Sequence, residues 1–288
     1  MGKAVFGETL ALTGDCDAVS QVTECVSKKD TMVFVTEKIY EGGFSVTYYC
    51  VDEEQNRYVL KMSTSGDAEA ERQLAHEDLV LATLDHENII KVFDYRPHIR
   101  SLILYDGGAS LFDEVAERRV TMEDAILYCH QMRSAVAYIH DRDVCHLDIK
   151  LDNMTITKQK VLKLIDFGLS EKGDMLRILT KVKGSHAYMA PELLDGSRGY
   201  FGEEVDSWAT GICMFAICTG KTPWTVAHVK DTRFMLFKEG CDHESDAVGF
   251  ILRQSVIGVD HLPADIVEVI NSLVVVDRHQ RRTVRDSF

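Results

Sequence analysis

Apolar and polar residues follow two different periods along the first part of the chain. Over residues 31–63, β-branched and aromatic residues alternate with polar ones, and the polar turns EGG and DEEQNR interrupt the pattern. Such alternation predicts three antiparallel strands. Residues 67–84 are rich in helix formers with leucines at helical spacing, whereas residues 87–95 and 101–106 return to strand patterns. The sequence therefore predicts a small sheet accompanied by one main helix.

From residue 106 on, the pattern is mostly helical. Ile126, Cys129, Val136 and Ile139 fall near one face of a long helix. The apolar run WATGICMFAIC at residues 208–218 is too short to span a membrane, and we interpret it as a buried helix. We therefore expect an α+β fold with two lobes, in which a small antiparallel β-sheet lobe precedes a larger, mostly helical one.

The same patterns divide the chain into three parts. Residues 1–30 mix small, polar and charged types without a sustained period, so we expect an N-terminal extension of uncertain order there. The strand-rich lobe covers residues 31–105 and the helical lobe covers residues 106–288. The sequence has no internal repeat and no Pro/Ser-rich linker, so the joint between the lobes is short, near LYDGG at residues 104–108.

Composition narrows the classes of function. The chain has 288 residues, a formal net charge of -14 and a pI of about 5.2. Such a protein repels phosphate backbones and acidic lipids, so no nucleic acid is expected as a partner and basic peptides are favoured. The eight cysteines form no CxxC pair, and the N-terminus lacks a basic region followed by an apolar stretch. We therefore expect reduced thiols in an intracellular, cytoplasmic protein. We also expect the chain to be monomeric.

The stretch HLDIKLDN at residues 146–153 carries the densest polar chemistry of the chain. Turns are usually built from Gly, Pro, Asn and Ser, and a structural loop does not need Asp148, Lys150, Asp152 and Asn153 so close together. This combination indicates a reaction centre.

Five motifs follow one another in a fixed order: the turn YEGGFS, the strand lysine of YVLKM, HLDIKLDN, DFG at residues 166–168 and APE at residues 190–192. In this order they resemble the eukaryotic-like protein kinase family, over residues 33 to 285. Lys150 together with Ser185 is similar to the serine/threonine branch. The segment VDSWATGICMFAICTGKTPW resembles the calcium/calmodulin-dependent kinase-like group. The resemblance implies ATP and Mg²⁺ as cofactors and a protein substrate.

The resemblance also implies roles for single residues. Asp148 would be the catalytic base, Lys150 would reach the γ-phosphate, Asn153 and Asp166 would bind Mg²⁺, and Lys61 would bind phosphates. The implied nucleotide pocket contains Ile39, Gly42, Gly43, Thr47, Val59, Ile103, Leu104, Tyr105, Asp106 and Thr155. Ile103 is expected at its rear, Thr155 at its floor and the backbone of residues 104–106 beside the adenine.

The partner of Lys61 needs a separate argument. Considered alone, Lys61 is equally well explained as a strand-edge lysine that faces solvent. Glu69, Glu71 and Glu77 all lie on the helix that follows. Counting back from LDHENII puts Glu77 at the family's position for the ion pair with the lysine, and leaves Glu69 and Glu71 on a solvated face.

Several other residues of the motifs are expected to be structural. His146 and Phe167 resemble residues that stack in the core behind the catalytic loop. Glu192 of APE has a candidate cation in Arg281, and Asp206 on the apolar helix resembles a residue that accepts hydrogen bonds from the catalytic-loop backbone. Ser185 is expected to bond Asp148 and Lys150.

The chain departs from the family in its glycine turn and in its adenine pocket. Tyr40 and Ser45 stand where the first and third glycines of the turn are usual, and Thr155 stands where leucine is usual. These departures support an alternative, a pseudokinase that acts as a nucleotide-binding scaffold or allosteric partner. Against this alternative, the charged residues that the reaction needs are all present.

Two further departures concern control and substrate. Leu147 occupies the place of an arginine that grips a phosphate on the activation segment, so we expect little dependence on phosphorylation there and control by a flanking segment or a regulatory partner. Asp152 favours a basic residue near the acceptor hydroxyl. Ser110 and Ala216 replace acidic residues of strongly arginine-directed kinases, which argues against a strict basic consensus.

Overall fold

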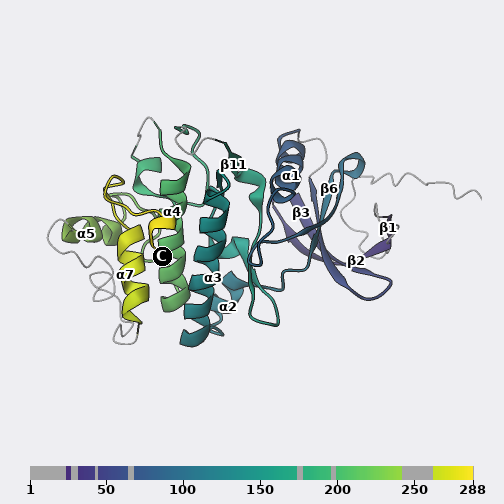
Figure 1. Cartoon of the computed structure of the whole chain (residues 1–288), viewed down its shortest axis with the longest axis horizontal. Coiled ribbons are helices and arrows are strands. Elements are labelled where there is room, and N and C mark those ends of the chain that lie inside the picture. The colour runs from purple at the N-terminus through teal and green to yellow at the C-terminus, as the bar shows by residue number, and fades with distance from the viewer. Residues whose placement is uncertain are drawn as a thin grey trace, which may run out of the picture.

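The computed structural model describes residues 24–26, 32–42, 45–63, 68–173, 178–195, 199–241 and 262–287. Gly43 and most of the expected extension over residues 1–30 lie outside these ranges. Within them the chain forms a sheet lobe, at the right of Figure 1, and a helical lobe at its left. The α+β class and the order of the two lobes are as predicted.

The sheet lobe contains six antiparallel strands in the order β1-β2-β3-β4-β6-β5. Their bounds are β1 Glu24–Val26, β2 Met32–Glu41, β3 Ser45–Asp52, β4 Arg57–Ser63, β5 Val92–Arg96 and β6 Ser101–Tyr105. The three strands expected in residues 31–63 are therefore confirmed. The alternation that predicted them puts Val33, Cys50, Leu60 and Ile103 together in a small core on one face of the sheet.

Helix α1, Ala68–Leu81, lies beside this sheet and confirms the helix expected over residues 67–84. It buries Leu74, Val80 and Leu81 in the main core, together with Leu102 and Leu104 of β6. Because this core continues into the helical lobe, these apolar residues pack the helix against both the sheet and the helical lobe.

The helical lobe is arranged around helix α4, Gly202–Thr219. Nearly all of its side chains are buried, so it can only be stable when it is surrounded by protein. Helix α3, Met122–His140, lies along one side of it and α7, Ala264–Leu273, along another (Figure 1). Gly211 permits the second contact, since a Cβ on it would lie 2.5 Å from Val274 Cγ2.

Shorter elements complete this lobe. The helices are α2 Leu111–Ala116 and α5 Thr232–Cys241, and the short strands are β7 Ala109–Ser110, β8 Val144–Cys145, β9 Met154–Ile156, β10 Leu162–Leu164 and β11 Glu171–Lys172. The 3-10 turns are η1 Pro97–Ile99, η2 Leu151–Asn153, η3 Phe167–Leu169, η4 Pro191–Leu193 and η5 Arg285–Ser287. Strands β10-β9-β7 form one small sheet and β11-β8 another. Strands of these small sheets precede and follow the two loops that contain HLDIKLDN and DFG.

Two negative findings apply to the described residues. None of their helices is both long enough and apolar enough to cross a lipid bilayer. Within the part of the chain that the structure describes, Cys50, Cys129, Cys145, Cys213 and Cys218 form no disulfide.

Candidate active site

Lys61 joins the sheet lobe to the loop that carries DFG. Alternation along β4 buries Leu60 on the far face of the sheet, so that Lys61 points to the opposite face, toward α1. Its Nζ donates to Glu77 Oε2 at 2.7 Å and to Asp166 Oδ1 at 2.8 Å. Among the three candidate glutamates, the structure therefore pairs Lys61 with Glu77. Arg72 binds Glu69 and Arg100 binds Glu71 nearer the surface.

One ammonium group is shared by two carboxylates at this point. Burial lowers the pKa of Lys61, but its attraction to Asp166 and Glu77 outweighs burial and raises that pKa above its ordinary value. Burial raises the pKa of the Asp166 carboxyl, yet Lys61 outweighs this effect and lowers the pKa to about 2. For Glu77 burial prevails, so its pKa lies above its ordinary value. Asp166 is therefore ionised throughout the physiological pH range.

The catalytic-loop residues of HLDIKLDN converge on Asp148. Asn153 Nδ2 donates to the Asp148 carbonyl at 2.9 Å and to its Oδ2 at 3.0 Å, and Lys150 Nζ lies 2.9 Å from the same Oδ2. Ser185 donates its hydroxyl proton to Asp148 Oδ1 at 3.0 Å and accepts from Lys150 Nζ at 2.9 Å. The expected bonds of Ser185 are thus confirmed, and the Asp148 carboxylate is fixed from three sides.

The backbone of this loop is fastened to the core through Asp206. Its Oδ2 accepts from the backbone N–H of His146 at 2.7 Å, and its Oδ1 accepts from that of Leu147 at 2.8 Å. Leu147 has a φ of 65°, a conformation that is costly for a side chain other than glycine. The carboxylate of Asp206 compensates for this cost by satisfying both backbone donors. The predicted role of Asp206 is confirmed.

His146 connects the catalytic loop to DFG. Its Nε2 donates to the Ile165 carbonyl at 3.0 Å, and its ring meets the edge of the Phe167 ring with centroids 4.7 Å apart. Both side chains are fully buried, as expected for core residues.

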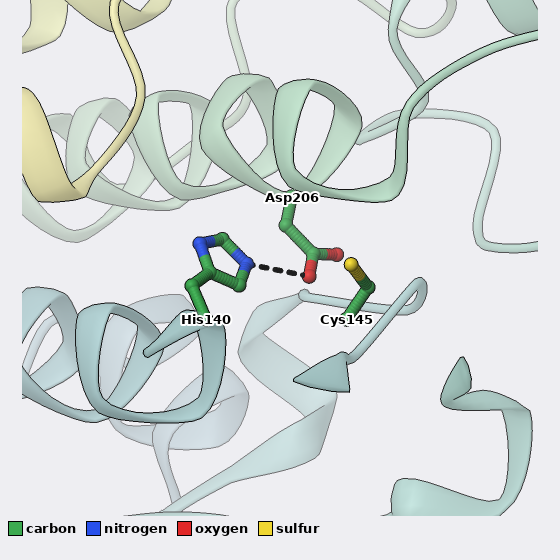
Figure 2. Close-up of side chains that lie close together, drawn as sticks. All are labelled: His140, Cys145 and Asp206. Carbon is green, nitrogen blue, oxygen red and sulfur yellow. Dashed lines mark hydrogen bonds and ion pairs between the residues drawn. The ribbon is translucent and has the colours of Figure 1, made fainter. Parts of the chain in front are cut away.

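His140 and Cys145 also lie next to Asp206, and the three side chains could be taken for a metal site (Figure 2). However, His140 Nε2 donates directly to Asp206 Oδ2 at 3.0 Å, which leaves no room for an ion between the two atoms. Burial, followed by the negative charge of Asp206, raises the pKa of the Cys145 thiol far above its usual range, which disfavours the thiolate form that binds metals. We assign this cluster to the scaffold.

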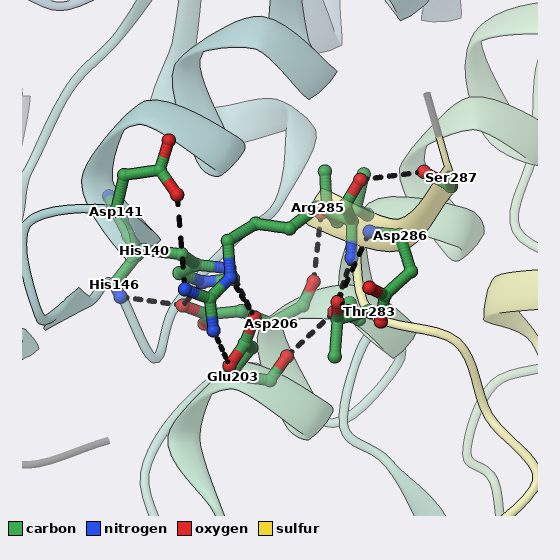
Figure 3. Close-up of polar contacts among 12 residues, drawn as sticks. His140, Asp141, His146, Glu203, Asp206, Thr283, Arg285, Asp286 and Ser287 are labelled. Carbon is green, nitrogen blue, oxygen red and sulfur yellow. Dashed lines mark hydrogen bonds and ion pairs between the residues drawn. The ribbon is translucent and has the colours of Figure 1, made fainter.

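A second group of polar contacts ties residues 283–287 to helix α4 (Figure 3). Arg285 binds both carboxylate oxygens of Glu203 at 2.6 Å, and the backbone N–H of Val284 donates to Ser207 Oγ at 3.0 Å. Arg281 forms a two-pronged, buried pair with Glu192, at 2.6 and 3.0 Å, which confirms the expected contact. The helix that holds the catalytic loop is therefore itself held by the segment around η5.

A cavity of about 460 Å³ lies between the two lobes, above the catalytic loop. The expected pocket residues that line it are Ile39, Thr47, Val59, Lys61, Glu77, Leu104, Tyr105, Lys150, Asn153, Thr155 and Asp166. The cavity is thus bounded by apolar walls on the sheet side and by charged groups at its inner end. Such a combination is typical of a site for a small polar ligand with a flat apolar part.

The expectation for Ile103 is wrong. Its backbone pairs with Leu60, and its side chain is buried with Val33 and Cys50 on the far face of the sheet. Leu104 pairs with Val59 and lines the cavity in its place. Because the side-chain period of a strand is two residues, an error of one residue exchanges the two faces.

Asp106 and Gly42 are not among the residues that line the cavity, and the backbone role expected for Asp106 stays a prediction. The Asp106 side chain does not line the cavity; it accepts from the Gly108 N–H at 2.9 Å and lies 3.2 Å from Arg57 Nε. Gly42 is not among the lining residues either, and its N–H donates to the Ser45 carbonyl at 2.9 Å. Gly43 lies outside the described residues.

Gly107, for which the sequence predicts no role in the pocket, lines the cavity beside the floor residue Thr155. A Cβ on Gly107 would lie 2.2 Å from Thr155 Oγ1, closer than nonbonded atoms can approach. The pair GG directly after a strand was the signal that could have indicated this close approach. Ile90, Ile165, Phe112 and Asp152 are further lining residues that were not assigned to the pocket.

Oxygen atoms suited to a hard cation occur at the inner end of the cavity. The Asn153 amide nitrogen is engaged by Asp148, so its oxygen is the atom left to act as a ligand. Asp166 uses Oδ1 to accept from Lys61 and from the Gly168 N–H, which leaves Oδ2 for a cation. Carboxylate and amide oxygens are ligands that Mg²⁺ prefers, so the donor set fits this ion.

The comparisons with known proteins agree with this geometry. The family model described as protein kinase domain matches residues 21–288. A probable serine/threonine-protein kinase PLK of Dictyostelium discoideum is 32% identical over 204 residues, which are 68% of this chain and 21% of that protein.

Two further relatives are the probable serine/threonine-protein kinase MARK-B of the same organism and the serine/threonine-protein kinase CHK1 of Saccharomyces cerevisiae. The first is 29% identical over 236 residues, 79% of this chain and 31% of that protein. The second is 34% identical over 163 residues, 54% of this chain and 31% of that protein. The matched segments thus span between a fifth and a third of the length of these relatives. The protein kinase domain model matches residues 21–288, which are nearly the whole chain. The chain therefore belongs to the protein kinase family.

Proposed function

We propose that this chain transfers the γ-phosphate of ATP to serine or threonine hydroxyls of protein substrates. The observation that carries the proposal is the contact of Lys61 with both Glu77 and Asp166, because it brings the sheet lobe, α1 and DFG together around the cavity. Phosphoryl transfer depends mainly on positioning and on neutralising charge, and this arrangement serves both.

The residues of the site have separate roles. The carbonyl and N–H groups near Tyr105 and Gly107 hold the adenine against Val59, Leu104 and Thr155. Lys61 binds phosphate oxygens, and its raised pKa keeps it a cation. Asn153 and Asp166 would hold Mg²⁺, which when bound neutralises the negative charge of the phosphates.

At the catalytic loop, Asp148 accepts the proton of the attacking hydroxyl. Its carboxylate is oriented by Asn153, Lys150 and Ser185 before any substrate arrives, which supports this role. Lys150 lies at the border between Asp148 and the cavity, from where it can move to the transferred phosphate. Asp152 is exposed at the cavity and favours a basic residue near the acceptor.

The alternative of a pseudokinase predicts nucleotide binding without turnover. An assay with radiolabelled ATP and a generic basic protein separates the two, with Asp166→Ala as the control. Incorporation of label at serine or threonine by the parent chain and not by the control supports the proposal. Binding of nucleotide by a parent chain that incorporates no label supports the pseudokinase.

A further inference from the structure

The activation segment of this chain lacks the usual anchor for a phosphate. Leu147, between His146 and Asp148, is buried and carries no donor, so it cannot bind an anion on the segment. Even so, the described part of the segment reaches the catalytic loop and places the Ser185 hydroxyl on Asp148. Other contacts hold it there, and the backbone pairing of Leu179 with Tyr200 is one of them.

Lys183 provides such a contact. Its Nζ donates to Glu171 Oε1 at 2.7 Å and to the Leu169 carbonyl at 3.0 Å. The Lys183 side chain is only 13% exposed and that of Glu171 is 37% exposed, so solvent screens this pair less than a surface ion pair. The pair joins the two ends of the activation segment, the one that follows DFG and the one that precedes APE.

Both ends of this pair lead directly to catalytic residues. Glu171 lies in β11 and is aligned with Cys145 of β8, immediately before the catalytic loop. Lys183 is followed by Gly184, which has a φ of 103° and approaches so closely that a Cβ on it would lie 2.9 Å from the Leu147 carbonyl. Ser185 comes next, with its bonds to Asp148 and Lys150. A shift of Lys183 therefore moves Ser185.

We propose that Lys183 and Glu171 form an ion pair that holds the activation segment in its catalytic arrangement without a phosphate. The inference rests on the proposed kinase function and names how that same site is positioned. The polarity is the reverse of a phosphate-dependent anchor, since here the part of the segment that precedes APE carries the cation, and the anion lies in β11. Lys183 acts through Ser185 and is a positioning residue.

The test uses phosphatase-treated protein and separates kcat from KM. Lys183→Met should lower kcat at least tenfold and leave the KM for ATP within twofold, because the nucleotide cavity does not include Lys183. Lys183→Arg, which keeps the charge, should retain most of the parent kcat. Lys181→Met removes an exposed lysine of the same segment and is the matched control, with a kcat close to the parent.

Exchange of the two charges tests the pair directly. Lys183→Glu should be as impaired as Lys183→Met, and adding Glu171→Lys to it should recover kcat at least fivefold. The proposal is overturned if Lys183→Met keeps the parent kcat, or if the exchanged pair is no more active than Lys183→Glu. A Lys183→Met chain that fails to fold leaves the decision to the exchanged pair.

A parent chain that transfers no phosphate refutes the proposed function but not the ion pair. The pair is then judged by hydrogen exchange of residues 178–190. Exchange in this segment should be faster in Lys183→Met and no faster still when Glu171→Gln is added. Unchanged exchange in Lys183→Met overturns the ion pair as the contact that holds the segment.

Discussion

Lys61 Nζ lies 2.7 Å from Glu77 Oε2, and the Glu77 side chain is only 1% exposed. The pair is therefore both a part of the proposed phosphate site and a buried ion pair of the fold. Removal of the lysine leaves the buried Glu77 carboxylate without its cation. Removal of the charges of both Lys61 and Glu77 leaves only Asp166, whose side chain is 43% exposed, without a cation.

Lys61→Met should lower kcat/KM at least a hundredfold, because phosphate oxygens lose their cation. The chain should remain folded but lose about 3 kcal/mol of stability, the cost of breaking a buried pair. Lys61→Met combined with Glu77→Gln should recover most of this stability and none of the activity. Melting temperatures and initial rates of the parent and both variants check this; activity near the parent level in either variant contradicts the assignment of Lys61.

Asp166→Asn should weaken the binding of nucleotide only when Mg²⁺ is present. The amide is a weaker, uncharged ligand, and it also loses the attraction to Lys61 that lowers the pKa of the carboxyl to about 2. Calorimetric titration with ATP, with and without Mg²⁺, measures the difference. Equal affinities of the parent and the variant for the magnesium complex, with equal activity, would exclude Asp166 as a metal ligand.

Thr180→Ala should retain most of the parent activity, and so should the parent after phosphatase treatment. Thr180 is exposed, and Leu147 cannot bind a phosphate placed on it. Steady-state rates of the two preparations give the answer. A loss of a hundredfold in both, about 2.7 kcal/mol in the activation barrier, would show that a phosphate on this segment matters despite Leu147.

Asp231 should contribute stability that depends on pH. It precedes α5, and its carboxylate accepts from the backbone N–H groups of Thr225, Val226, Arg233 and Phe234. Burial opposes ionisation, but these four bonds outweigh it and lower the pKa of Asp231 below its ordinary value. A depressed pKa in the folded state means that the contribution is complete above about pH 4 and is lost as the pH falls through the folded-state value.

Asp231→Ala should accordingly cost about 1 kcal/mol at neutral pH, and the difference from the parent should shrink below about pH 4. Chemical denaturation across this pH range measures it, with Glu123→Gln at an exposed position as the control. A difference that is constant down to pH 2 would rule out the carboxylate as its source.

The charged residues of the site could be predicted, because their types and their order along the chain match the motifs of protein kinases. Glu77 could be assigned by counting along the helix, and the structure places it on Lys61. Positions in the adenine pocket were harder to predict from the sequence. The strand β6 has only five residues, and its pattern does not define which of Ile103 and Leu104 faces the cavity. The register with β4 decides this, and register depends on contacts that are distant in sequence.

The contact of Lys183 with Glu171 could not be predicted in the same way. The two residues lie in a segment without helical or strand periodicity, and their meeting depends on the pairing of β11 with β8. Likewise, the exclusion of a side chain at position 107 follows from the floor residue Thr155, which is close only in the folded chain.

The pairs made by Arg281 and Arg285 affect how a nascent chain can complete the helical lobe. Glu192 and Glu203 leave the ribosome 89 and 82 residues before the arginines that neutralise them. Until residues 281–287 have been synthesised, α4 can pack against α3 only with two uncompensated carboxylates close to the core, which is unfavourable. We therefore expect α4, with its apolar surface, to depend on chaperones during translation. We also expect the catalytic loop to form its hydrogen bonds with Asp206 only after the segment around η5 has left the ribosome.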